Sequence, residues 1–272
     1  AWRTTDQALG REPASFRLWM MREDLALDLR RNPDALDALS RARKLIEDGG
    51  PLEAVREWHT RRAEFAYWIE KDPEEAARHL DFLPTAEDGD GRPPLRLLVL
   101  LDQERYDDVL REVAPMLARQ PDHPDLQLVQ AEGLAGMEAW ESLRAHLDGV
   151  GEEAKQRSVF WHLRGICRSH LGDLQGSRED LERSAHMEQD NLRFMLDAGH
   201  ACADLGEWER AEQFWRQALR LDEQSEEALT QLSEARRTLH DEEGAKRLLR
   251  ECLLHHPESE AAQVMLAELE AN

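Results

Sequence analysis

Large side chains recur at equal intervals through the middle of this chain. They stand 34 residues apart at four positions: Tyr106, Trp140, Leu174 and Trp208. Pro121 and Pro257 are separated by four of the same intervals. A period of this length is typical of repeat architectures, in which each repeat is one supersecondary unit that cannot bury its apolar face alone. The spacing therefore predicts a row of stacked units rather than a single globular core.

The clearest unit runs over residues 191–223 and predicts two short amphipathic helices. A tight turn at Leu205-Gly206-Glu207 separates them. Apolar or small side chains recur at three- and four-residue steps on both helices: Met195, Ala198, Gly199 and Cys202 on the first, then Ala211, Trp215, Ala218 and Leu219 on the second. Small residues at this seam let two helix backbones approach closely, so we expect an antiparallel pair.

This unit closely resembles a tetratricopeptide repeat, a helix–turn–helix of about 34 residues. The resemblance is strong over 158–257, degenerate but in phase over 93–157, and weak before that. It implies an all-α fold, a right-handed superhelical solenoid of stacked antiparallel helix pairs. A helix over 260–270 is expected to shield the last open face as a cap.

Composition changes once along the chain, at residues 84–94. This stretch is rich in Pro, Gly and acidic residues and has no apolar anchor. We expect it to link an N-terminal helical region of degenerate hairpins (1–83) to the repeat array (95–272). It is equally compatible with a long loop inside one continuous superhelix.

Charge and cysteine content narrow the function classes. A net charge of −22 argues against nucleic acid, which needs clustered Lys and Arg, and against an anionic membrane surface. Basic proteins, cationic peptides or a halophilic cytoplasm fit this charge. The three cysteines form no disulfide framework. We expect a bacterial, cytoplasmic protein without membrane insertion, with the periplasm as the alternative. Because the chain begins at Ala1, we expect a fragment of a longer sequence, whose targeting segment would not be visible.

The sequence contains no catalytic signature. It lacks a nucleophile elbow, a phosphate-cradling glycine loop and a zinc-protease helix. Its glycines are explained by turns and helix contacts, and its carboxylates by exposed pairs with arginine on helices. We therefore expect a protein that is not an enzyme and has no cofactor and no bound metal.

The resemblance implies a binding groove lined by the first helix of each repeat. The positions that line it in the family are occupied here by His162, Ile166, His170, Arg193, Leu196, His200 and Arg237, among others. We expect these side chains to be dispensable for folding. Three imidazoles in this set could also hold a metal ion, but their spacing is not diagnostic. No Lys or Asn is present at the positions with which some family members grip a terminal carboxylate.

Aromatic residues divide into two groups. Trp161, Trp208 and Trp215 occupy the family's large-residue positions and are expected in the core. Phe65, Tyr67 and Trp68 lie on one helix of the N-terminal region, where we expect one of them to be exposed to a partner.

The pattern favours a protein–protein interaction scaffold that holds a peptide or a helix of a partner protein. Two alternatives stay open. The chain could be the docking region of a larger enzyme or of a cell-envelope export or secretion assembly, or it could form a homo-oligomeric structural array.

Overall fold

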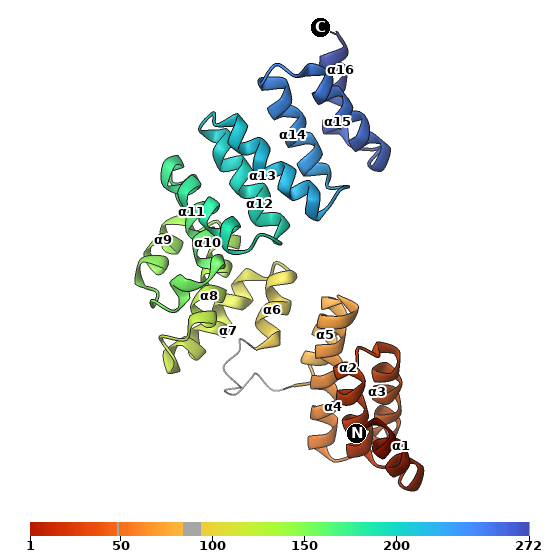
Figure 1. Cartoon of the computed structure of the whole chain (residues 1–272). Coiled ribbons are helices and arrows are strands. Elements are labelled where there is room, and N and C mark those ends of the chain that lie inside the picture. The colour runs from red at the N-terminus through yellow and green to blue at the C-terminus, as the bar shows by residue number, and fades with distance from the viewer. Residues whose placement is uncertain (48, 84–93, 272) are drawn as a thin grey trace. The chain divides into compact units, whose positions relative to one another are not determined.

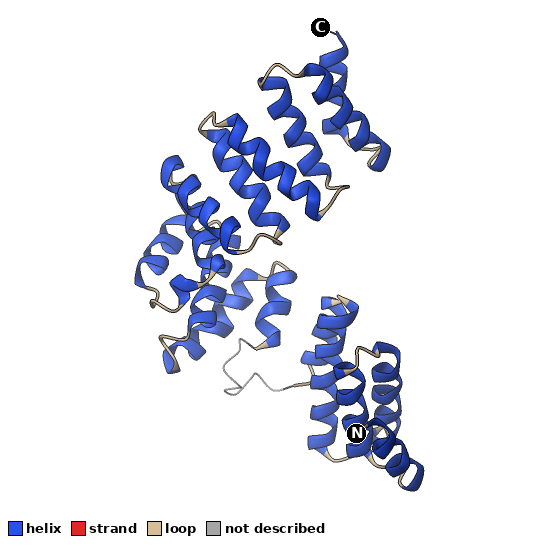
Figure 2. Cartoon of the chain, in the orientation of Figure 1, coloured by secondary structure: helices blue, strands red, loops and turns tan. Residues whose placement is uncertain are grey.

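The computed structural model describes residues 1–47, 49–83 and 94–271. Within these ranges every regular element is helical and no strand occurs (Figure 2). None of the described helices is long and apolar enough to cross a membrane. The predicted all-α class is confirmed.

The described chain divides into two compact units, residues 1–116 and 117–272. The division falls inside the helix α7 (Tyr106–Arg119). Of the predicted linker 84–94, residues 84–93 lie outside the described residues. The expected boundary between an N-terminal region and the array therefore stays a prediction.

Unit 1 (1–116) is a series of short helices in which α2 and α3 form a closely packed pair (Figure 1). The helix that carries the aromatics Phe65, Tyr67 and Trp68 continues from α4 into five residues of π-helix, η1. The elements before α7 are α1 (Trp2–Arg11), α2 (Phe16–Asp28), α3 (Asn32–Ile46), α4 (Leu52–Phe65), η1 (Ala66–Glu70), α5 (Pro73–Leu80) and α6 (Leu95–Asp102).

Unit 2 (117–272) is a stack of antiparallel helix pairs that follow one another along the chain (Figure 1). The four large residues that recur every 34 positions each begin the second helix of a pair. They are Tyr106, Trp140, Leu174 and Trp208. The elements are α8 (Pro124–Gly136), α9 (Trp140–Gly149), η2 (Ala154–Gln156), α10 (Ser158–His170), α11 (Leu174–Met187), α12 (Leu192–Asp204), α13 (Trp208–Leu221), α14 (Glu226–Thr238), α15 (Glu242–His255) and α16 (Glu260–Ala271).

The turn inside each pair has one backbone signature. Residues with left-handed φ recur at the 34-residue period, although only two of them are glycine: Glu104 (55°), Glu138 (55°), Gly172 (85°), Gly206 (74°) and His240 (65°). Such a residue reverses the chain after a helix, and glycine adopts it without steric cost. The turn geometry is thus kept where the glycine is not.

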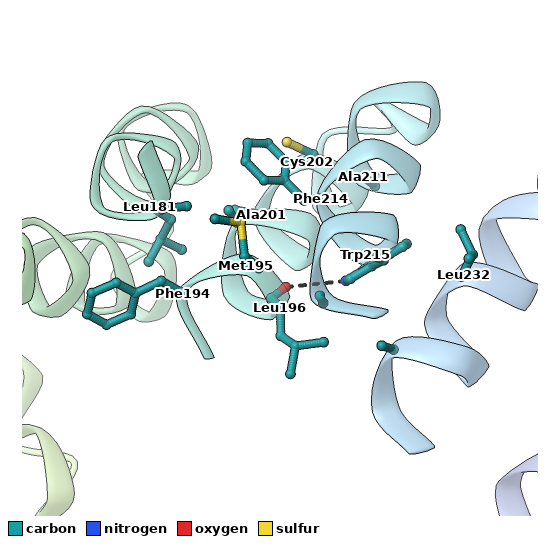
Figure 3. Packing of buried hydrophobic residues seen from close by; sticks show 14 of the residues in the cluster. Leu181, Phe194, Met195, Leu196, Ala201, Cys202, Ala211, Phe214, Trp215 and Leu232 are labelled. Atoms are coloured by element: carbon teal, nitrogen blue, oxygen red, sulfur yellow. Dashed lines mark hydrogen bonds between the residues drawn. The ribbon is translucent and has the colours of Figure 1, made fainter. Parts of the chain in front are cut away.

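The repeat over residues 191–223 has the predicted core. Met195, Trp215 and their small neighbours are buried in one cluster with Leu181 and Phe194 (Figure 3). The indole Nε1 of Trp215 donates to the backbone oxygen of Leu196 at 3.3 Å. Other aromatics lie closer to solvent than expected: Trp161 and Trp208 are only half-buried. Trp161 lies under the guanidinium groups of Arg183 and Arg164, with 3.5 and 4.4 Å between each Cζ and the ring centroid.

Ion pairs cross between successive repeats, and their signs are reversed between α11 and α13. On α11, Arg178 pairs with Glu182 (3.1 Å) and with Glu207, which lies in the turn between α12 and α13 (3.8 Å). One period later, on α13, the signs are reversed, because Glu212 pairs with Arg216 (2.8 Å) and with Arg236 on α14 (2.5 Å). The stack therefore joins its units through partly buried charges as well as through apolar packing.

The last described helix, α16, packs on α15 through Ala262 and Leu269. Both side chains are buried. That this helix caps the array stays a prediction.

Candidate functional site

The predicted groove residues lie on α10, α12 and α14, the first helices of three successive pairs in unit 2. Capping side chains fix where two of these helices begin. Asn191 accepts from the backbone N–H of Phe194, and Ser225 accepts from that of Ala228. These bonds satisfy amide groups that the first helical turn leaves open. The helical phase of the groove residues is set by these starting points.

His162 is the most enclosed of the predicted groove residues, with 6% of its surface exposed. Its Nε2 lies 2.7 Å from Oδ2 of Asp197 on α12, and its ring stacks on Phe194 with the centroids 4.5 Å apart. The Nε of Arg193 is 3.6 Å from the same carboxylate oxygen. Asp197 therefore brings His162 and Arg193 together across two helices.

Leu196 and Ile166 contribute to packing. Leu196 is buried in the core cluster of α12 and α13, and Ile166 is half-buried against the same cluster. The expectation that groove side chains are dispensable for folding is wrong for Leu196 and for His162. The reason is physical: adjacent first helices approach closely enough to cover the side chains between them.

His200, His170 and Arg237 are more accessible, and each has a partner. The Nε2 of His200 lies 3.7 Å from Glu227 on α14, and its ring meets Trp215 edge-on at 5.5 Å. His170 is exposed on one face and stacks in parallel on Trp140, with ring centroids 3.8 Å apart. Arg237 pairs with Glu234 of its own helix through Nε at 2.9 Å.

A carboxylate therefore lies beside each of four basic side chains of the predicted groove: His162, Arg193, His200 and Arg237. Asp197 was absent from the predicted set, although it follows Arg193 by four residues and that spacing signals an ion pair on a helix. These side chains can present hydrogen-bonding groups to a partner. As binding residues, the predicted seven stay predictions.

A pocket of about 340 Å³ opens beside this face. Four segments of unit 2 line it: the first turn of α8, the residues before α10, the start of α10 and the end of α11. Leu128 and Val159 supply apolar walls, together with Met187, which is 44% exposed. Charged and polar side chains complete the lining: Asp125, Gln156, Arg157, Ser158 and Glu188. Sequence patterns did not reveal the pocket because its lining is distant along the chain.

A second cluster has donor atoms suited to a metal ion, namely Glu182, Cys202 and Glu207. Arginines already neutralise its carboxylates: Arg210 lies 2.8 Å from Glu182 and 3.2 Å from Glu207. Burial, with the Glu182 carboxylate beside the thiol, raises the pKa of Cys202 to about 12. Because a thiol must lose its proton to bind a metal, this environment opposes a metal centre.

Unit 1 separates the three predicted aromatics. Phe65 is buried, Tyr67 is half-buried, and Trp68 is 52% exposed. Tyr67 and Trp68 meet edge-on, with ring centroids 4.7 Å apart. Both belong to η1, and π-helical turns are rare in proteins and frequent at functional sites. Trp68 is thus the exposed aromatic that the sequence left undecided.

The sequence matches no protein-family model and no curated protein. Similarity is found among solved structures. A structure described as MamA AMB-1 P212121 has a TM-score of 0.53 and 13% identity, covering 60% of this chain and 97% of that one. "Crystal structure of MamA protein" has a TM-score of 0.50 and 12% identity, covering 60% and 92%. A shorter likeness, at a TM-score of 0.41 and 18% identity, is to "First TPR of Spaghetti (RPAP3) bound to HSP90 peptide SRMEEVD" over 43% of this chain and 92% of that one.

These likenesses concern the fold, since all the identities are low. They agree with the periodic helix starts and with the left-handed turn residues that recur between Glu104 and His240. The chain therefore has the tetratricopeptide repeat fold.

Proposed function

We propose that this chain is a non-catalytic interaction scaffold whose unit 2 binds an extended segment of a partner protein beside α10. The pocket lined by Leu128, Val159 and Met187 carries the proposal. Its volume and mixed lining suit one anchoring side chain, with polar groups at the rim to orient the backbone. Methionine fits partners of different shape because its side chain is flexible and polarisable.

The charges at the pocket favour a partner segment in which Lys or Arg stands next to the anchoring side chain. Asp125 and Glu188 face only one cationic side chain in the lining, Arg157, whose Nη2 is 3.8 Å from Asp125. The whole chain carries a net charge of −22, which steers basic segments toward it. The proposed partner segment therefore has an apolar residue followed or preceded by Lys or Arg.

The test selects binding peptides from a random display library with the full chain and measures their affinities by fluorescence polarisation. Met187→Glu places a charge in the pocket and should lower the affinity for the selected peptides tenfold or more. Met137→Glu is the matched control, because Met137 is also 44% exposed but lies outside the pocket lining. Equal affinities for the two variants would remove the pocket from the binding site.

A charge reversal tests the partner chemistry separately. Asp125→Lys combined with Glu188→Lys should shift the selected peptides from basic toward acidic residues beside the anchor. An unchanged selection would contradict the proposed basic partner while leaving the pocket in place. Sedimentation of the wild type at two concentrations accompanies both tests, because self-association through the same face would compete with the peptide.

A further inference from the structure

Two histidines face each other in unit 1, away from the proposed peptide site. His59 on α4 and His79 on α5 place their Nδ1 atoms 3.0 Å apart, with ring centroids separated by 5.1 Å. This centroid distance fits two imidazoles whose Nδ1 atoms point toward each other. Both rings meet the edge of the buried Trp58, at 5.0 and 5.2 Å. Phe82 stacks on His59 with its centroid at 4.3 Å.

The number of protons between the rings is limited by this geometry. His79 Nε2 lies 3.3 Å from Oε1 of Glu75, which can only accept while it is ionised. His79 therefore carries its hydrogen on Nε2 and accepts at Nδ1, and His59 donates from its own Nδ1. A first additional proton can add to Nε2 of His59. A second would have to add to Nδ1 of His79, where the N–H of His59 already points.

The surroundings also oppose charging of the pair. Burial is the main cause that lowers the pKa of both imidazoles, and Arg43 on α3 acts in the same direction on each. Each of the two rings is close to the other, and the charge of His79 further lowers the pKa of His59. The hydrogen bond and charge of the Glu75 carboxylate on α5 raise the pKa of His79 and partly offset its burial, while Arg62 on α4 has a smaller, lowering effect. Two arginines and one carboxylate thus face the pair.

We propose that His59 and His79 form an acid-sensitive latch that holds α5 against α4. In the closed state the pair shares one hydrogen between its Nδ1 atoms. In the open state the rings separate, each can bind a full complement of protons, and Phe82 loses its stacking partner. Acidification therefore favours the open state.

Other contacts of α5 are modest, so the latch can decide whether this helix stays docked. α5 spans Pro73–Leu80 and buries only Ala76 and Leu80. They pack in a small cluster with Ala63, Ala66 and Val99. Arg62 adds a hydrogen bond of 3.3 Å to Glu75. Helices this short are not stable by themselves in water, so α5 depends on its docking.

The direction of the pH effect follows from proton counting. A histidine whose pKa is lowered in the closed state stabilises that state above its ordinary pKa of about 6.5, and this stability is lost as pH falls. Once the open state binds one proton more than the closed state, the open-to-closed ratio rises about tenfold per pH unit. The slope should begin below about pH 6.5.

Hydrogen exchange of the intact protein, followed by mass spectrometry between pH 7.5 and 5 and corrected for intrinsic rates, tests the latch. The expected result is a rise in opening of α5 of up to tenfold per pH unit in wild type, with α12 and α13 unchanged as internal references. His59→Gln combined with His79→Gln leaves no imidazole there to take up a proton and should remove the slope. His255→Gln, at an exposed site in unit 2, should keep it. A slope retained in the double variant overturns the proposal.

A second measurement does not depend on any variant folding. Nitrogen chemical shifts of the wild-type imidazoles report which ring atoms carry protons. The latch requires His79 to keep its hydrogen on Nε2 near neutral pH and to stay unprotonated at Nδ1 while α5 is docked. Full, independent titration of both rings near pH 6.5, with α5 still protected from exchange, would show that no latch exists.

Discussion

Gly199 on α12 lies against the indole of Trp215 on α13, so that a Cβ added at Gly199 would be 2.3 Å from the ring nitrogen. Gly199→Ala should therefore lower the free energy of unfolding of unit 2 by up to about 2 kcal/mol. Overpacking costs about 1–3 kcal/mol, and the better helix propensity of alanine returns about 1 kcal/mol. Urea denaturation followed by circular dichroism measures the change.

Gly10 provides the matched control, because it is also helical and a Cβ there would meet nothing within 4 Å. Gly10→Ala should stabilise its helix by about 0.5–1 kcal/mol. The steric account of Gly199 fails if both alanine variants gain stability.

The left-handed turn residues predict stabilising substitutions. Glu138→Gly and His240→Gly should each raise the free energy of unfolding by up to about 1 kcal/mol, because glycine removes the strain of a left-handed non-glycine residue. Gly206→Ala should lower it by about 1 kcal/mol at the equivalent position. Thermal unfolding of the three variants checks the prediction, which is contradicted if Glu138→Gly and Gly206→Ala shift stability in the same direction.

Glu23 on α2 should make unit 1 less stable as pH rises from 4.5 to 7. Its side chain is 1% exposed, and burial raises its pKa from 4.5 to about 7 despite the charge of Arg61, whose Nη1 is 3.4 Å away. A raised acid pKa gives stability that is complete below pH 4.5 and is lost as pH rises to 7. The loss is on the order of 3 kcal/mol. Hydrogen exchange of α2 measures it, and Glu23→Gln should flatten the dependence.

Because the latch at His59 weakens as pH falls and Glu23 lowers the stability of unit 1 as pH rises, the two effects have opposite signs within one unit. Glu23→Gln should leave the acid slope of α5 unchanged. If it abolishes that slope instead, the two sites belong to one cooperative transition.

Asp180 on α11 is buried and accepts from Arg164 and Arg168, each at 2.7 Å. Asp180→Ala should lower the free energy of unfolding by about 3–5 kcal/mol, because it leaves two partly buried guanidinium groups without their carboxylate. Glu179→Ala, at an exposed neighbouring position, is the control and should change stability by less than about 0.5 kcal/mol. Chemical denaturation of both variants provides the comparison.

The sequence was sufficient for the repeat architecture because the pattern concerns residues that are near one another along the chain. The equal spacing of Tyr106, Trp140, Leu174 and Trp208 predicts where four helices begin. The core position of Trp215 also follows from helical spacing. Burial of Trp208 was overestimated, since a first-turn residue lies at the end of the helix–helix contact.

The site depended on contacts that local patterns do not encode. His162 meets Asp197 across two helices, and the pocket combines Leu128 with Met187 from different repeats. The inter-helix distance decides whether a groove residue projects or is covered, and sequence spacing within one helix does not contain that distance. The imidazole pair in unit 1 escaped notice for the same reason, because His59 and His79 are twenty positions apart.

The reversal of charge between Arg178 and Glu212 makes two neighbouring repeats of the stack unlike each other in their ion pairs. A shortened chain lacking residues 192–225 would join α11 to α14, in the same phase of the period. Arg178 would then take the place of Glu212 beside Arg236, and Asp241, one period after Glu207, would be the carboxylate left to pair with both arginines. Neighbouring units of this array are therefore not interchangeable in their ion pairs.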